Sequence, residues 1–305
     1  MHATSRPGLT RRSFLTRTLV LGLGLATLPA AGALTACSSE DPEPDARLLE
    51  LVGTLRALET SPVDAGSGIF AAQADLVSGE IVRQCGTENP ESCTATLDTV
   101  VVPADTPTVA TARDQMTAVL PDAADSDQAA LLAGLFAALA TVADTDAGAP
   151  AIDWTVVETP LGSEDSTRRK TAASALEEAT SRIHEAVWLT GRVLPTAGTP
   201  ATAVTTVAGR LRQLRDVSMA VTDVPAAVGY TFPDGTAAPT DAASSATVLL
   251  TAVHAVTVEL RRAVGSVDAE DRATVAMWCA VSARCEAALE DQLGINPLSV
   301  AVRGE

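Results

Sequence analysis

Aromatic side chains are scarce in this sequence, which holds three Trp, one Tyr and four Phe among 305 residues. A hydrophobic core must therefore be built mainly from Ala, Val and Leu. Small side chains let helices approach one another closely, so this composition favours packed helices over β-sandwiches. Lysine is rarer still, since Lys170 is the only one and all other basic side chains are arginines.

Positive charge is also in deficit. The chain has 21 basic and 38 acidic residues, a formal charge of −17, and its first 36 residues hold four of the arginines and no acid. Without that segment the formal charge is −21. A surface this acidic repels nucleic acid and anionic lipid, so we expect no nucleic-acid partner.

The residues and motifs of common catalytic sites are few. Only His184 and His254 follow the first 36 residues, and the sequence has no Gly-x-Ser-x-Gly, no Cys-x-x-Cys and no phosphate-binding loop. Residues 66–71 (GSGIFA) match a dinucleotide glycine pattern, but they follow a predicted helix instead of a strand, which indicates a loop and a helix start. The sequence therefore predicts no catalytic residues and no cofactor, and a non-enzymatic role is favoured.

The first 36 residues have the pattern of an export signal. An arginine-rich start is followed by an apolar run from Leu19 to Leu34, which is too short for a typical spanning helix. Thr10 to Thr16 (TRRSFLT) resembles the twin-arginine export motif, with Thr16 where lysine is common. The sequence therefore predicts a twin-arginine signal peptide over 1–36.

A lipid anchor is predicted at the end of this signal. Leu34 to Cys37 (LTAC) resembles the lipobox of bacterial lipoproteins, in which the cysteine is acylated and the chain is cut before it. The alternative is an ordinary cleaved signal with a chance cysteine. Residues 37–45 then predict an acidic tether, because they hold two prolines and no large apolar side chain. We expect a protein anchored through Cys37 to the outer face of a cell membrane.

The four other cysteines are Cys85, Cys93, Cys279 and Cys285, and an even number in an exported protein favours two disulfides. Cys279 and Cys285 lie six residues apart in one predicted helix, about 9 Å along its axis, which is too far for a bond between them. Both remaining two-bond pairings join the Cys85–Cys93 segment to the last helix. The alternative is a Cys85–Cys93 bond with two free thiols.

Apolar periodicity predicts an all-α protein. In the first half, residues 46–150 form a predicted helical region, and residues 97–102 and 152–157 have the composition of short extended segments. In the second half, four long helices within residues 166–300 predict a four-helix bundle. The predicted helices cover residues 46–60, 68–84, 106–119, 126–144, 167–193, 201–222, 242–265 and 269–292.

Three stretches of the second half resemble one family. They are 184–191 (HEAVWLTG), 210–216 (RLRQLRD) and 230–233 (YTFP). They are similar to segments of a ferritin-like domain family of uncharacterised exported actinobacterial proteins, over about residues 170–300. Departures are Ile183, where that family tends to have Glu, and Trp188 and Thr190, which replace two Tyr. The resemblance implies a ferritin-like bundle with the N-terminal helices packed on it, and it implies no activity.

A ferritin-like fold raises the question of a metal site. Di-iron bundles use inward carboxylates and two Glu-x-x-His pairs, but Ser181 and Thr251 stand three residues before the two histidines. The weak candidate ligands are Glu178, His184, Glu185 and Glu259. The leading hypothesis is therefore a tethered module that binds a protein or small-molecule partner. The alternative is a ferritin-like metal-binding protein or oxidoreductase.

Overall fold

The computed structural model describes residues 43–64, 68–86, 90–103, 105, 107–142, 151–162, 165–198, 200–233 and 237–305. The predicted signal peptide and Cys37 lie outside these ranges. In the described ranges the regular structure is entirely helical, as the sequence predicted. Residues 41–305 form one compact unit.

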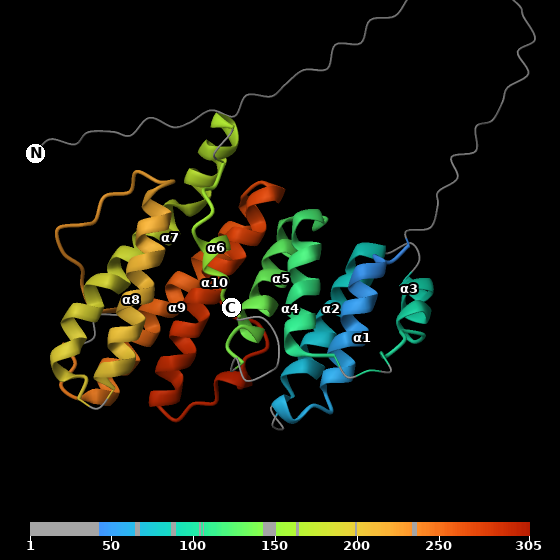
Figure 1. Ribbon diagram of the computed structural model, residues 1–305, viewed down its shortest axis with the longest axis horizontal. Helices are drawn as coiled ribbons and strands as arrows, with labels where there is room; N and C mark the ends of the chain where they lie inside the picture. Colours follow the sequence, from blue (N-terminus) through green and yellow to red (C-terminus); the bar gives the residue numbers. More distant parts are fainter. Residues whose placement is uncertain are drawn as a thin grey trace, which may run out of the picture. The chain divides into compact units, whose positions relative to one another are not determined.

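In the described part of the first half there are six α-helices, and contacts connect α1 to α5. The helix α1 packs on α2 and α4, α3 packs on α2, and α4 packs on α5 (Figure 1). Asp45 starts α1 because its carboxylate accepts the backbone N–H of Arg47 at 2.8 Å. Their bounds are α1 Ala46–Leu58, α2 Ile69–Cys85, α3 Pro90–Leu97, α4 Val109–Val119, α5 Ser126–Leu139 and α6 Trp154–Val157.

The second half is a bundle of four long helices. The helices α7 and α10 each pack against both α8 and α9. Asp241 and Ser244 form a reciprocal capping box at the start of α9. The bounds are α7 Ser166–Val193, α8 Ala201–Met219, α9 Ala242–Ser266 and α10 Ala269–Gln292.

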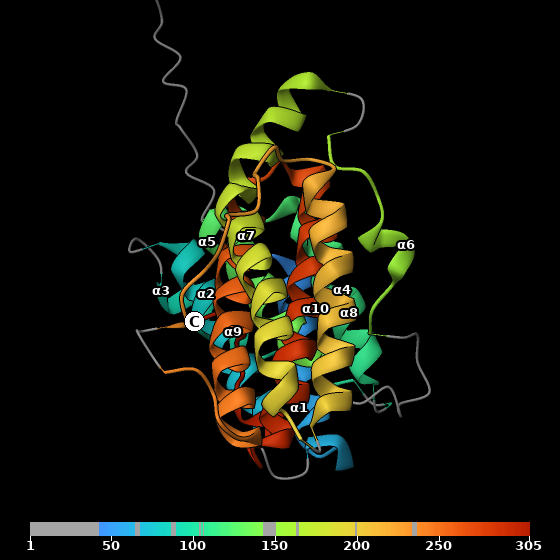
Figure 2. The same cartoon turned by 90° about the vertical axis from the view of Figure 1, so that its left-hand side faces the viewer.

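One long connection distinguishes this bundle from a simple up-and-down arrangement. Short turns join α7 to α8 and α9 to α10, whereas the chain between α8 and α9 runs along the side of the bundle (Figure 2). The Thr196 hydroxyl lies 2.8 Å from that of Ser245, which places the end of α7 beside the start of α9. It follows that α8 and α9 run in the same direction.

A single hydrophobic core links the two halves. The helix α5 packs on both α9 and α10, and buried side chains from α1 to α10 belong to one cluster. The N-terminal helices are therefore packed on the bundle, as expected. Apolar burial, which scales with the area removed from water, stabilises the contact between the halves.

Two segments that the sequence predicted to be extended do not form strands. Residues 154–157, expected to be extended, form the one-turn helix α6, because Asp153 accepts the N–H of Thr155 at 2.9 Å and so caps a helix start. Residues 98–102 follow α3 without forming a strand. The composition of both segments favours strands, but no neighbouring strand exists among the described residues to pair with them.

Candidate functional site

The carboxylates proposed as metal ligands are held by arginines instead. Arg182 on α7 lies 3.0 Å from Glu178 and 3.1 Å from Glu185, and the charge of Glu259 also acts on it. Glu259 pairs with Arg262 at 2.7 Å. A guanidinium thus sits between the two α7 carboxylates, where a metal ion would have to bind them both.

His184 forms its hydrogen bond with a different group from these carboxylates. The imidazole is buried, and its Nε2 donates to the carbonyl oxygen of Val224 at 3.2 Å. That bond fixes the start of the connection between α8 and α9 against α7. Within the described ranges, no three His, Cys, Asp or Glu side chains gather closely enough to hold a metal ion.

Aromatic residues hold a later part of the connection between α8 and α9 against α7. The ring of Trp188 on α7 lies 5.9 Å from Tyr230 and 6.1 Å from Phe232, centroid to centroid, and the guanidinium of Arg192 lies 5.5 Å from the Trp188 ring. These distances suit tilted aromatic packing and a cation–π contact. Two of the stretches that carry the family resemblance therefore meet in space, where they fasten the connection to the bundle.

The centre of the bundle holds two hydroxyls that bond to each other and a thiol that bonds a backbone carbonyl. Thr257 on α9 donates to the Ser282 hydroxyl at 2.9 Å, and the Cys279 sulfur lies 3.8 Å from the Thr257 carbonyl oxygen. All three side chains are fully buried. The two hydroxyls bond across the α9–α10 contact, and the thiol bonds the backbone of α9.

The predicted disulfides between the halves are wrong. Cys279 and Cys285 are free, buried thiols inside the bundle. The helix α5 packs on α10, whereas Cys85 lies at the end of α2, which packs on α1 and α3. Cys85 does not carry a free thiol, and the side chain of Cys93 lies outside the described residues. The alternative Cys85–Cys93 bond stays a prediction.

A buried charged cluster lies one turn further along the α9–α10 contact, and sequence reasoning missed it. Arg303 is almost completely buried, and its guanidinium bonds Glu290 at 2.7 and 2.8 Å and Glu286 at 3.0 Å. His254 on α9 is half-buried, with its Nδ1 3.6 Å from Glu286. The carboxylate of Glu286 raises the pKa of His254.

The segment around Arg303 is bound by backbone contacts as well. Its N–H donates to the Gly134 carbonyl at 3.1 Å, and the Gln73 amide donates to the Ala301 carbonyl at 2.8 Å. Arg261 donates to the Gly304 carbonyl at 2.9 Å. The 297–305 segment is thus a structural strap across α2, α5, α9 and α10.

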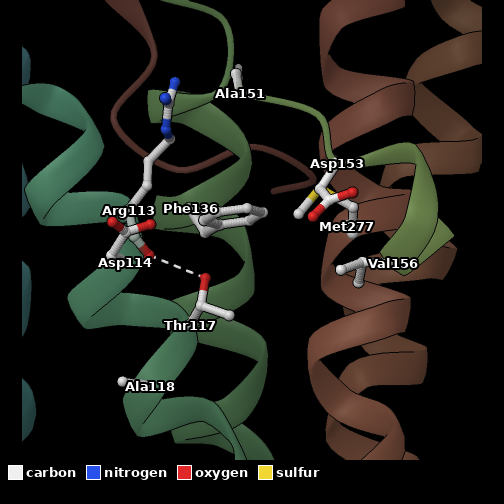
Figure 3. A pocket seen from close by; sticks show the side chains of 9 residues that line it. All are labelled: Arg113, Asp114, Thr117, Ala118, Phe136, Ala151, Asp153, Val156 and Met277. Atoms are coloured by element: carbon white, nitrogen blue, oxygen red, sulfur yellow. Dashed lines mark hydrogen bonds between the residues drawn. The ribbon is translucent and has the colours of Figure 1, made fainter. Parts of the chain in front are cut away.

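An open cleft of about 380 Å³ lies between α4, α5, α6 and α10 (Figure 3). Phe136 and Met277 line its apolar part, and the carboxylates of Asp114 and Asp153 lie on its walls with Arg113. Asp153 is occupied in capping α6, where it also accepts the Thr155 hydroxyl at 2.6 Å. The Asp153 carboxylate therefore serves the start of α6 and is not a free group in the cleft.

Among the described helices, α9 alone is long and apolar enough to cross a membrane. Half of its apolar stretch is buried against neighbouring helices, which is the property of a core helix.

Comparison with protein-family models, curated proteins and solved structures finds no match.

Proposed function

We propose that the chain is an exported lipoprotein, anchored to the outer face of a membrane through Cys37, whose helical domain is a binding or interaction module. The observation that carries the proposal is the order of four features: the arginine pair, the short apolar run, the Leu34–Cys37 lipobox and the acidic tether. The first helix begins at Ala46, directly after the tether. That position supports a folded domain held close to its anchor.

The non-enzymatic part of the proposal is supported by how the charged side chains are used. Glu178 and Glu185 share Arg182, and Glu286 and Glu290 share Arg303. A catalytic carboxylate must be free to exchange a proton or contact a substrate. These four carboxylates serve ion pairs, which is a structural use.

The second candidate is a ferritin-like metal-binding protein, and the connectivity of the bundle favours it. Four helices with one long crossover between the second and third is the arrangement of ferritin-like folds. The donor set opposes it, since neither histidine follows a Glu at the required spacing. We therefore propose a ferritin-like bundle that does not use the di-iron ligand pattern.

Two experiments test the two parts separately. Arg11→Lys with Arg12→Lys should block export if the twin-arginine route is used, and normal export would indicate the general secretory route. Metal analysis of the purified domain tests the second candidate. Stoichiometric iron or manganese that is lost in Glu178→Gln or Glu185→Gln, but kept in Glu158→Gln, would replace the binding-module proposal with the metal-protein one.

A further inference from the structure

The segment after α3 presents valines to solvent. Val101 is 83% exposed and Val102 is 50% exposed, against near-complete burial for most valines in the helices. A Cβ atom at Gly53 of α1 would lie 2.6 Å from the carbonyl oxygen of Val101. The segment therefore lies directly on the backbone of α1, and this close contact fixes where the two side chains are displayed.

Partly buried apolar side chains surround the two valines. A shallow hollow on one side is lined by Leu49 and Val100, and a second is lined by Leu97, Val100 and Val102. We call Leu49, Leu97, Val100, Val101 and Val102 the valine surface. It differs from the single exposed apolar residues elsewhere, such as Val228, because its members are contiguous.

The valine surface lies close to the start of the folded chain. Gly53 is seven residues into α1, about 10 Å along the axis from Ala46 at 1.5 Å per residue. The eight peptide steps from Cys37 to Asp45 reach at most about 30 Å. Any bilayer that holds Cys37 is therefore within reach of this surface.

We propose that the valine surface rests on the bilayer that anchors Cys37, an inference that depends on the lipoprotein assignment made above. Two or three small apolar side chains would bind a membrane only weakly by themselves. A short tether converts this weak contact into an intramolecular one with a high effective concentration. The valine surface would then set the orientation of the domain on the membrane, while the acyl group on Cys37 provides the anchor.

Charge near the surface predicts which lipid it accepts. Exposed Glu50 and Asp98 border it. Arg56, the nearby cation, lies 2.9 Å from Glu59 and 2.7 Å from Asp75, so its charge is already compensated. A zwitterionic headgroup layer fits this pattern, and an anionic one would be repelled.

The test uses the acylated mature protein on phosphatidylcholine vesicles, with a nitroxide label on Val101→Cys or, as the matched control, on Val228→Cys. We expect the label at 101 to lose collisions with a water-soluble nickel complex and to keep those with oxygen. The label at 228 should be unaffected by vesicles. Adding Val102→Asp, or exchanging part of the lipid for phosphatidylglycerol, should restore nickel collisions at 101.

Equal nickel collisions at both positions, on protein that floats with the vesicles, would overturn the inference and leave the lipoprotein assignment standing. A mature protein without an acyl group that does not float would overturn both. Mass measurement and flotation are therefore recorded on the same samples before the labels are read.

Discussion

Arg303 and Glu290 form a buried bidentate pair, in which Nη1 lies 2.7 Å from Oε1 and Nη2 lies 2.8 Å from Oε2. The same guanidinium also bonds Glu286 at 3.0 Å. Removing one member of a buried ion pair leaves a charge without compensation, which typically costs about 3–5 kcal/mol. This pair therefore contributes directly to keeping the 297–305 strap in place.

The first prediction concerns that charge. Arg303→Met should lower the free energy of unfolding by about 3–5 kcal/mol, measured by urea denaturation, because two carboxylates stay buried without their cation. Combining it with Glu286→Gln and Glu290→Gln should recover part of the loss. A change below about 1 kcal/mol in the single variant would mean that the cluster is solvated and not buried.

The second prediction uses two helix glycines as a matched pair. A Cβ at Gly134 in α5 would lie 2.6 Å from Val302 and 3.0 Å from the Arg303 carbonyl, whereas one at Gly209 in α8 meets nothing within 4 Å. Gly→Ala in a helix normally stabilises by up to about 1 kcal/mol. We expect Gly209→Ala to raise the thermal unfolding midpoint and Gly134→Ala to lower it. Stabilisation by both would show that the strap does not lie on α5.

The third prediction is a pH dependence. The Glu286 carboxylate raises the pKa of His254 above its ordinary value near 6.5. A raised pKa in the folded state means that the protonated histidine stabilises the fold. This contribution is fully present below pH 6.5 and is lost as the pH rises through the folded-state pKa.

This pH dependence is tested by urea unfolding midpoints of the natural chain and of His254→Gln, measured between pH 5.5 and 8.5. The stability advantage of the natural chain should shrink as the pH rises. The half-exposed ring makes the effect modest. An advantage that is constant or grows with pH would contradict the pairing.

The fourth prediction concerns the thiols. Burial raises the pKa of Cys285 to about 12 and raises that of Cys279 as well. Neither should react with iodoacetamide in the folded protein at pH 8, because the thiolate is the reactive form. Both should be labelled after unfolding without reductant, while Cys85 and Cys93 should need reductant first. Peptide mapping that finds Cys85 labelled without reductant would contradict the Cys85–Cys93 bond.

Most of the helices could be predicted because their apolar spacing is local. The predicted helix over 269–292 matches α10, and the helix over 242–265 differs from α9 by one residue. The predicted ends of α5 and α8 lie too far along the chain, since alanine and valine continue the apolar pattern beyond the last turn. Periodicity places helices well, and helix ends depend on caps and packing.

The charged cluster could not be predicted because its burial is non-local. Glu286 and Glu290 are four residues apart on α10, a spacing that usually marks a solvated helix face. They are buried only because the chain returns across them 13 residues after Glu290 and inserts Arg303. Similarly, Cys279 and Cys285 were paired with distant cysteines because spacing does not reveal that α5 lies against α10.

We propose above that the mature chain begins with an acylated Cys37, and the intact mass of the protein extracted from membranes tests this directly. We expect a chain that starts at Cys37 and carries the added mass of a diacylglycerol group, with the N-terminal peptide bearing the modification. Cys37→Ala should abolish both the added mass and cleavage before residue 37. A mature chain without lipid on Cys37, or one that starts elsewhere, would contradict the claim.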